Sequence, residues 1–152
     1  MTIQVSVIGS GAEHEANAEQ IGRRLADAGA TVVTGGLGEV MAAAARGARS
    51  VGGTTIGILP TESRESANEW IEHVVVTAIG HARNLAVVAS GDAVIAVGGR
   101  YGTLAEIGLA LTLGRPVIVL EPGWQVDGTR RAQTPAEAVE FALEAARHTD
   151  VT

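Results

Sequence analysis

The chain has 152 residues, 46% of them hydrophobic, which is enough for one domain with a core of its own. Its formal net charge of −6 excludes nucleic acid as the main partner, because binding to a phosphate backbone needs clustered cations in excess. No apolar run approaches the ~18 residues that a membrane-spanning helix needs, and no basic segment precedes an apolar one at the start. We therefore expect a single cytoplasmic domain over residues 1–152, with no membrane partner.

Two absent residue types exclude further classes of chemistry. All 11 basic residues are arginine, so the chain has no lysine to form a Schiff base with pyridoxal phosphate and none for a Walker A loop. It has no cysteine, which excludes disulfides and thiolate metal sites. Its four histidines lack the spacing of metal ligands, so we expect no metal site.

Short apolar runs alternate along the chain with longer segments of helical period. In chain order the expected elements are a strand at 3–8, a helix at 16–28, a strand at 31–34, a helix at 40–51, strands at 54–59 and 73–77, a helix at 81–90, a strand at 93–97, a helix at 103–113, a strand at 116–120 and a last helix that opens at 134. A polar loop covers 61–69. The expected strands are rich in Val and Ile rather than alternating, which is typical of a parallel sheet buried on both faces. The predicted fold is a doubly wound, Rossmann-like α/β domain.

Three glycine-rich loops follow expected strands and precede expected helices. Right-handed crossovers bring such loops to one edge of the sheet, where ligands bind near the reversal of strand order. Glycines let the backbone approach a phosphate, and a new helix offers it free N–H groups. The loop residues expected to bind a phosphorylated ligand are Gly9, Ser10, Gly35, Gly36, Gly38, Gly98, Gly99, Arg100, Tyr101, Gly102 and Thr103. The alternative is that each loop is only a tight turn.

A dinucleotide site is a weaker interpretation of the first loop. Gly9 and Gly11 supply the first two glycines of a GxGxxG fingerprint, but the third position is His14. The second strand ends in Thr34 without an acidic residue for a ribose hydroxyl. The sequence therefore disfavours a standard NAD site.

Residues 98–106 resemble the GG-x-GT-x-x-E signature of the Lonely Guy superfamily, whose members are often labelled lysine decarboxylases. Residues 35–41 are similar to the second glycine loop of that superfamily, and 80–84 to its arginine segment, so the resemblance covers about residues 3 to 120. Its cytokinin-activating members cleave nucleoside 5'-monophosphates to free base and ribose 5-phosphate. Val97 and Asn84 depart from the hydrolase pattern, and residues 80–84 and 102–111 resemble the branch that contains molybdenum-cofactor carrier proteins. A pyridoxal-type decarboxylase conflicts with the absence of lysine.

The resemblance implies a pair of catalytic candidates. Glu106 is the carboxylate that would stabilise an oxocarbenium-like state or activate water, and Arg83, with Asn84 beside it, would face the same site and hold the phosphate. Each has an alternative. Thr103 and Glu106 also fit a helix capping box, as do residues 66–69 and 134–137, and Arg83 also fits a partly exposed helix position.

Two function classes remain open at this point. The first is a carrier that binds a nucleotide, a phosphate or a molybdopterin-type ligand and requires no cofactor of its own; the second is a phosphoribohydrolase. The segment 104–113 is apolar nearly all round, so one sheet face cannot cover it, and superfamily members are typically oligomers. We therefore expect a homodimer or homotetramer with a small phosphorylated molecule as its other partner.

Overall fold

The computed structural model describes residues 1–149, in which strands and helices alternate along the chain. The strands are β1 (Gln4–Ser10), β2 (Thr31–Thr34), β3 (Thr55–Leu59), β4 (His73–Val76), β5 (Ala93–Gly98), β6 (Val117–Leu120) and β7 (Arg130–Ala132). The α-helices are α1 (Glu15–Asp27), α2 (Val40–Ser50), α3 (Arg83–Ser90), α4 (Tyr101–Thr112) and α5 (Pro135–Thr149). Short 3-10 turns cover Ala12–His14, Arg64–Ser66 and Gly80–Ala82.

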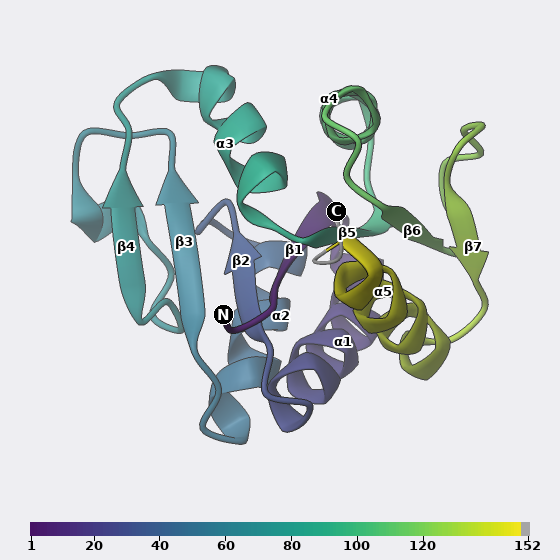
Figure 1. The fold of residues 1–152 in the computed structure, drawn as a ribbon. Helices are drawn as coiled ribbons and strands as arrows, with labels where there is room; N and C mark the ends of the chain where they lie inside the picture. The colour runs from purple at the N-terminus through teal and green to yellow at the C-terminus, as the bar shows by residue number, and fades with distance from the viewer. Residues whose placement is uncertain (150–152) are drawn as a thin grey trace.

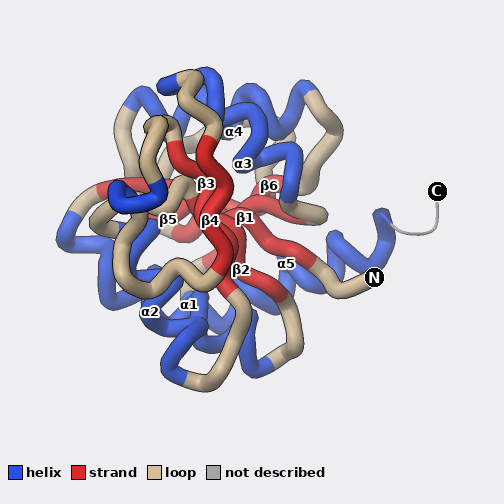
Figure 2. Tube along the Cα trace, turned by 90° about the vertical axis from the view of Figure 1, so that its left-hand side faces the viewer, coloured by secondary structure: helices blue, strands red, loops and turns tan. Residues whose placement is uncertain are grey.

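The strands form one parallel sheet between two helix layers. Seven strands pair in the order β4-β3-β2-β1-β5-β6-β7, and every pairing is parallel (Figure 1). Figure 2 shows the strand layer with α3 and α4 on one side and α1 and α2 on the other. The doubly wound Rossmann-like fold is thus confirmed. Within residues 1–149, no helix has both the length and the apolar character to cross a bilayer.

Alternate residues of the central strands supply two separate cores. In β5, Ile95 and Val97 pack with α1, α2 and α5, whereas Val94 and Ala96 pack with α3 and α4. Successive strand side chains point to opposite faces, so a strand covered on both faces must be apolar throughout. This is why the near-continuous apolar runs predicted the interior strands correctly.

Helices α1 and α2 approach each other closely through two glycines. A Cβ at Gly22 would lie 1.8 Å from the Ala44 carbonyl oxygen, and one at Gly47 would lie 2.0 Å from that of Glu19. No side chain fits in such gaps, so both positions need glycine for packing rather than for backbone conformation. The tight contact holds α1 and α2 as one layer against the sheet.

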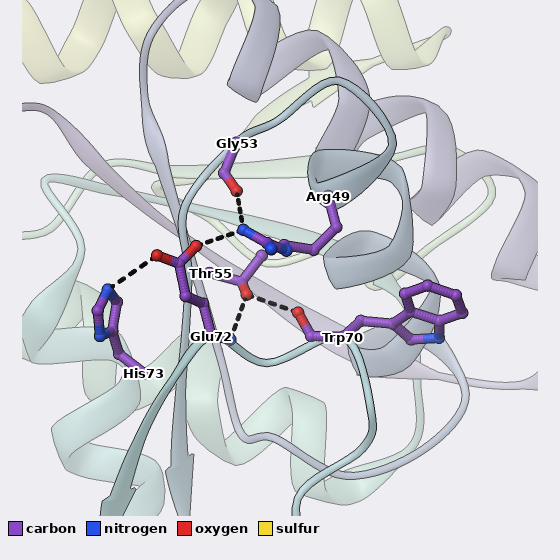
Figure 3. A network of polar contacts seen from close by, with 6 residues as sticks. All are labelled: Arg49, Gly53, Thr55, Trp70, Glu72 and His73. Atoms are coloured by element: carbon purple, nitrogen blue, oxygen red, sulfur yellow. Dashed lines mark hydrogen bonds and ion pairs between the residues drawn. The ribbon is translucent and has the colours of Figure 1, made fainter.

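Polar contacts fix the edge strand β4 at its amino end (Figure 3). The buried Thr55 hydroxyl donates to the Trp70 carbonyl at 2.7 Å and accepts from the Glu72 N–H at 2.8 Å. The Glu72 carboxylate pairs with Arg49 of α2 and lies 3.3 Å from His73. These contacts lie at the opposite edge of the sheet from the glycine loops, and they tie the long 61–72 connection to the domain.

Two local expectations were wrong or incomplete. Strand β7 was not predicted, because its Arg130 and Arg131 are exposed and it is held by pairing with β6 rather than by an apolar run. Residues 66–69 form no capping box: the 3-10 turn there starts at Arg64 and is capped by Ser63. The predicted cap of α5 forms, since the Glu137 N–H donates to the Thr134 hydroxyl at 3.1 Å.

Candidate functional site

The strand order reverses beside β1. From β1 the chain builds β2, β3 and β4 on one side of it and then returns to place β5 on the other. In the β1–β5 register, Gly9 faces Val97 and Ser10 faces Gly98. The loops that follow β1 and β5 therefore leave the sheet side by side, at the position where α/β folds bind ligands.

A cavity of about 940 Å³ opens at this reversal. The loops after β1, β5 and β6 line it, together with one residue of the loop after β2. Its lining residues are Ser10, Gly11, Ala12, Glu13, His14, Glu39, Gly98, Gly99, Arg100, Pro122, Gly123, Trp124 and Gln125. Four of the predicted ligand residues are among them: Ser10, Gly98, Gly99 and Arg100.

Glycine is required where β1 and β5 end. Gly9 has a φ of 138°, and a Cβ there would lie 1.9 Å from the Val97 carbonyl oxygen. Gly98 has a φ of 61°, and a Cβ there would lie 2.2 Å from Cδ2 of His14. The first glycine lets the two strands meet, and the second lets the His14 ring lie against the backbone. Gly98 lines this large cavity, whereas Gly9 lies just before the strand end without lining it.

The start of α4 lies at the rim of the same cavity. Arg100 precedes the helix, and no side chain caps its first turn, so the leading N–H groups lack a side-chain partner, as they do in anion-binding helices. The Trp124 ring N–H donates to the Arg100 carbonyl at 3.1 Å. The Tyr101 ring lies 5.9 Å from the Trp124 ring, and Tyr101 is 80% exposed. An aromatic pair thus borders an uncapped helix start.

The capping-box interpretation of Glu106 is wrong. The helix starts at Tyr101, so Thr103 is a buried residue within the first turn rather than the cap, and Glu106 lies well inside the helix. Its carboxyl group is not available to the backbone N–H groups at the helix start. The side chain has another environment.

Glu106 and Arg83 meet in a second, much smaller cavity of about 60 Å³. This cavity is lined by Val7, Ile8, Gly9, Gly35, Met41, Arg83 and Glu106. Arg83 is only 8% exposed, which overturns the alternative of a surface position for it. One guanidinium N–H donates to the Gly35 carbonyl at 3.4 Å, a second donates to the Asn84 side-chain oxygen, and the buried Nε has no partner within residues 1–149.

Burial dominates the electrostatics of this pair. It raises the pKa of Glu106 to about 7, and the charge of Arg83 lowers that pKa only in part. Burial also lowers the pKa of Arg83, with Glu106 acting in the opposite direction. A carboxyl group with a pKa near 7 exchanges its proton at neutral pH, which suits an acid or a base.

The structure separates the predicted residues into three groups. Ser10, Gly98, Gly99 and Arg100 line the large cavity, whereas Gly9, Gly35, Arg83 and Glu106 line the small one. The remaining predicted residues line neither cavity: Gly36, Gly38, Asn84, Tyr101, Gly102 and Thr103. Gly36 has a structural role instead, since its N–H donates to the Thr34 hydroxyl and its carbonyl accepts from the Asn68 N–H.

Several lining residues were not predicted. Glu13, His14 and Glu39 follow glycine loops but match no ligand-binding pattern, and Pro122, Gly123 and Gln125 follow β6 and match none either. The only available signal was position, since each lies just beyond the carboxyl end of a strand. Within residues 1–149, no group of three or more His, Cys, Asp or Glu side chains is arranged to hold a metal ion.

Sequence comparisons find relatives over nearly the whole chain. The sequence profile of the SLOG cluster4 family matches residues 2–149. An uncharacterised protein of Archaeoglobus fulgidus is 41% identical over 93% of this chain and 95% of its own length. The cytokinin riboside 5'-monophosphate phosphoribohydrolase of Mycobacterium tuberculosis is 34% identical over 74% of this chain, and the match spans 65% of that enzyme.

Solved structures of similar proteins superpose on nearly the whole chain. The molybdenum cofactor binding protein of Rippkaea orientalis superposes with a TM-score of 0.88 at 30% identity, over 100% of this chain and 99% of its own. The molybdenum cofactor carrier protein of Chlamydomonas reinhardtii gives a TM-score of 0.87 at 29% identity, over 97% and 99%. The match of the profile to almost every residue, on the predicted superfamily fold, shows that the chain belongs to the SLOG cluster4 family.

Proposed function

We propose that this protein binds a small phosphorylated, nucleotide-like ligand in the large cavity, as a carrier of the molybdenum-cofactor type. The cavity of about 940 Å³ at the strand-order reversal carries the proposal. Arg100 lines the cavity and supplies a cation, and the uncapped start of α4 directly follows it, so the positive end of the helix dipole adjoins the cavity. Trp124 offers a flat apolar face to a ring system.

The position of the charged pair favours binding over catalysis. Arg83 and Glu106 line the small cavity, which is too confined for a nucleotide, and neither lines the large one. The similarity to two proteins named for binding or carrying the molybdenum cofactor supports the same choice. Molybdopterin carries a phosphate and a fused ring system, the two groups that the rim of the cavity is suited to receive.

Binding is tested by thermal shift and calorimetry with purified protein. The probes are AMP, GMP, inorganic phosphate and tungstate, because a ligand that binds only the folded state raises the melting temperature. We expect the nucleoside monophosphates to raise it more than inorganic phosphate does, since they fill more of the cavity. Equal melting temperatures with every probe, together with no heat of binding, would rule out a phosphate-binding cavity.

The second candidate function is a phosphoribohydrolase that cleaves the N-glycosidic bond of nucleoside 5'-monophosphates. The pKa of about 7 for Glu106 favours it, because a carboxyl group with that pKa serves as acid or base at neutral pH. The similarity to the Mycobacterium tuberculosis phosphoribohydrolase supports it as well. The test is release of free base from AMP and related monophosphates, with Glu106→Gln as the control. This candidate predicts release by the wild-type protein but not by the variant, and no release from any monophosphate refutes it.

The assembly is a homodimer or homotetramer in which a second copy covers the outer face of α4. Ala105 and Gly108 are exposed there, and Leu113 at the end of the helix is 41% exposed. The neighbouring Leu85 of α3 is 45% exposed, and Glu106 is the only charged residue between Arg100 and Arg115. A two-fold interface is self-complementary, which suits a smooth apolar face without charges to pair.

A further inference from the structure

Glu39 has a backbone conformation that glycine adopts far more easily. It lies between β2 and α2 with φ 55° and ψ −123°, which is unfavourable for a residue with a Cβ. Its side chain does not cap α2, although it directly precedes that helix. Instead it reaches across to the loop that follows β1. The unfavourable backbone conformation of Glu39 therefore occurs together with a side-chain contact to a different loop of the site.

That contact places a carboxylate on a backbone N–H of the first glycine loop. The Gly11 N–H donates to Oε2 of Glu39 at 2.6 Å. Both residues line the large cavity. In a glycine loop of this kind a backbone N–H commonly holds a phosphate oxygen of the ligand. Here the carboxylate of the protein itself already holds that N–H.

The loop after β5 lies directly beside the one that Glu39 contacts. Ser10 and Gly98 are register partners, and the Gly99 N–H donates to the Ser10 carbonyl at 3.1 Å. Neighbouring strands are about 4.8 Å apart, so two phosphates joined by one oxygen would reach both loops, whereas a single phosphate would reach one. With the first loop held by Glu39, only the β5 loop and the start of α4 remain open to an anion.

The charges of the lining residues also favour an anion at the start of α4 over one at the β1 loop. Glu13, Glu39 and Arg100 line it, which gives a formal charge of −1 with His14 neutral. Arg100 precedes α4, whereas both carboxylates belong to the loops after β1 and β2. The side of the cavity at β1 therefore repels an anion and accepts hydrogen bonds, while the side at α4 attracts one.

We propose that Glu39 determines specificity by keeping phosphate away from the β1 loop, so that the cavity takes ligands with one phosphate group rather than two. That phosphate binds at the start of α4, and the Glu39 carboxylate accepts hydrogen bonds from hydroxyl or amino groups at the other end of the ligand. This inference rests on the proposed function, because it concerns the same cavity. It names the ligand class as monophosphate esters with hydrogen-bond donors.

The test compares inorganic phosphate and pyrophosphate as probes by calorimetry, with wild-type protein, Glu39→Gly and Glu39→Gln. Glycine suits the backbone conformation, frees the Gly11 N–H and removes the charge. Pyrophosphate should bind Glu39→Gly at least about tenfold more tightly than wild type, while phosphate affinity changes by less than about threefold. Glu39→Gln removes only the charge and should show a smaller gain. Glu15→Gln is the matched control, since Glu15 opens α1 without lining the cavity, and it should alter neither affinity.

The proposal is overturned if Glu39→Gly binds pyrophosphate no better than wild type, or if phosphate gains as much as pyrophosphate. If Glu39→Gly does not fold, the same comparison is made with Glu39→Gln. A ratio of pyrophosphate affinity to phosphate affinity no higher than that of wild type then overturns the proposal. Failure here is distinguishable from failure of the proposed function. Wild-type protein that binds AMP while Glu39→Gly shows no gain retains the function and loses this inference. If Glu39→Gly binds pyrophosphate more tightly but wild type binds no nucleotide, this inference is retained and the proposed function is lost.

Discussion

Glu106 and Arg83 line the small cavity, where burial opposes the charge of each. The folded protein binds the Glu106 proton more tightly than the unfolded chain does, since burial raises its pKa from 4.5 to about 7. The stability gained from this proton is fully present below about pH 4.5 and is lost as the pH rises through 7. It amounts to about 3 kcal/mol at most.

The Glu106→Gln substitution tests this pH dependence. The neutral amide cannot ionise, so the variant should match wild type near pH 4 and exceed its melting temperature by several degrees at pH 8. Melting curves of both proteins from pH 4 to 8 provide the measurement. Glu140→Gln, at an exposed position of α5, is the control and should show no such trend. A wild-type-to-variant difference that stays constant with pH would contradict a buried, proton-binding Glu106.

At the level of single elements, the start of α4 allows a test that separates backbone from side chain. Tyr101 is the first helical residue, where proline fits the backbone and removes only an N–H that has no partner inside the helix. Tyr101→Pro should therefore weaken binding of AMP about tenfold relative to Tyr101→Ala, which lacks the ring but keeps the N–H. Calorimetry with both variants measures the difference. Equal affinities would show that this N–H does not contact the phosphate.

The α1–α2 contact makes a separate prediction about stability. Gly47→Ala would force its Cβ against the Glu19 carbonyl and should destabilise the fold by about 1–3 kcal/mol. Gly102→Ala, in the first turn of α4, meets open space and should stabilise it by up to about 1 kcal/mol. Urea titrations of the two variants give both values. Similar effects for the two substitutions would mean that the helices do not pack as closely as described.

For the whole molecule, the outer layer of α3 and α4 makes a prediction about assembly. Leu85→Glu would place a charge within the proposed interface and should convert the oligomer to monomer. Ala16→Glu, exposed on α1 at the opposite face of the sheet, should leave the oligomer intact. Light scattering with size-exclusion chromatography gives the mass of each. A wild-type protein that is already monomeric would refute the proposed assembly.

The elements were predictable to different degrees. Interior strands such as β5 were recognisable, because burial on both faces demands an apolar residue at every position. The short edge strand β7 was not, since two of its three residues are exposed arginines and its place is set by backbone pairing with β6 rather than by an apolar run. Thr103 and Glu106 have the spacing of a capping box, yet the helix starts two residues earlier, at Tyr101. Helix starts depend on the turn before them, which a four-residue pattern does not describe.

The sequence by itself determined the α/β class, the alternation of strands and helices, and the presence of glycine loops at strand ends. These features follow from hydrophobic periodicity and backbone freedom, which act over short stretches of chain. Only the tertiary structure decided how those loops divide between two cavities, and that Arg83 and Glu106 are buried away from the larger one. It also decided that Glu39 contacts Gly11, 28 residues earlier. Burial and cross-loop contacts depend on which strands are neighbours, and strand order is a property of the folded chain.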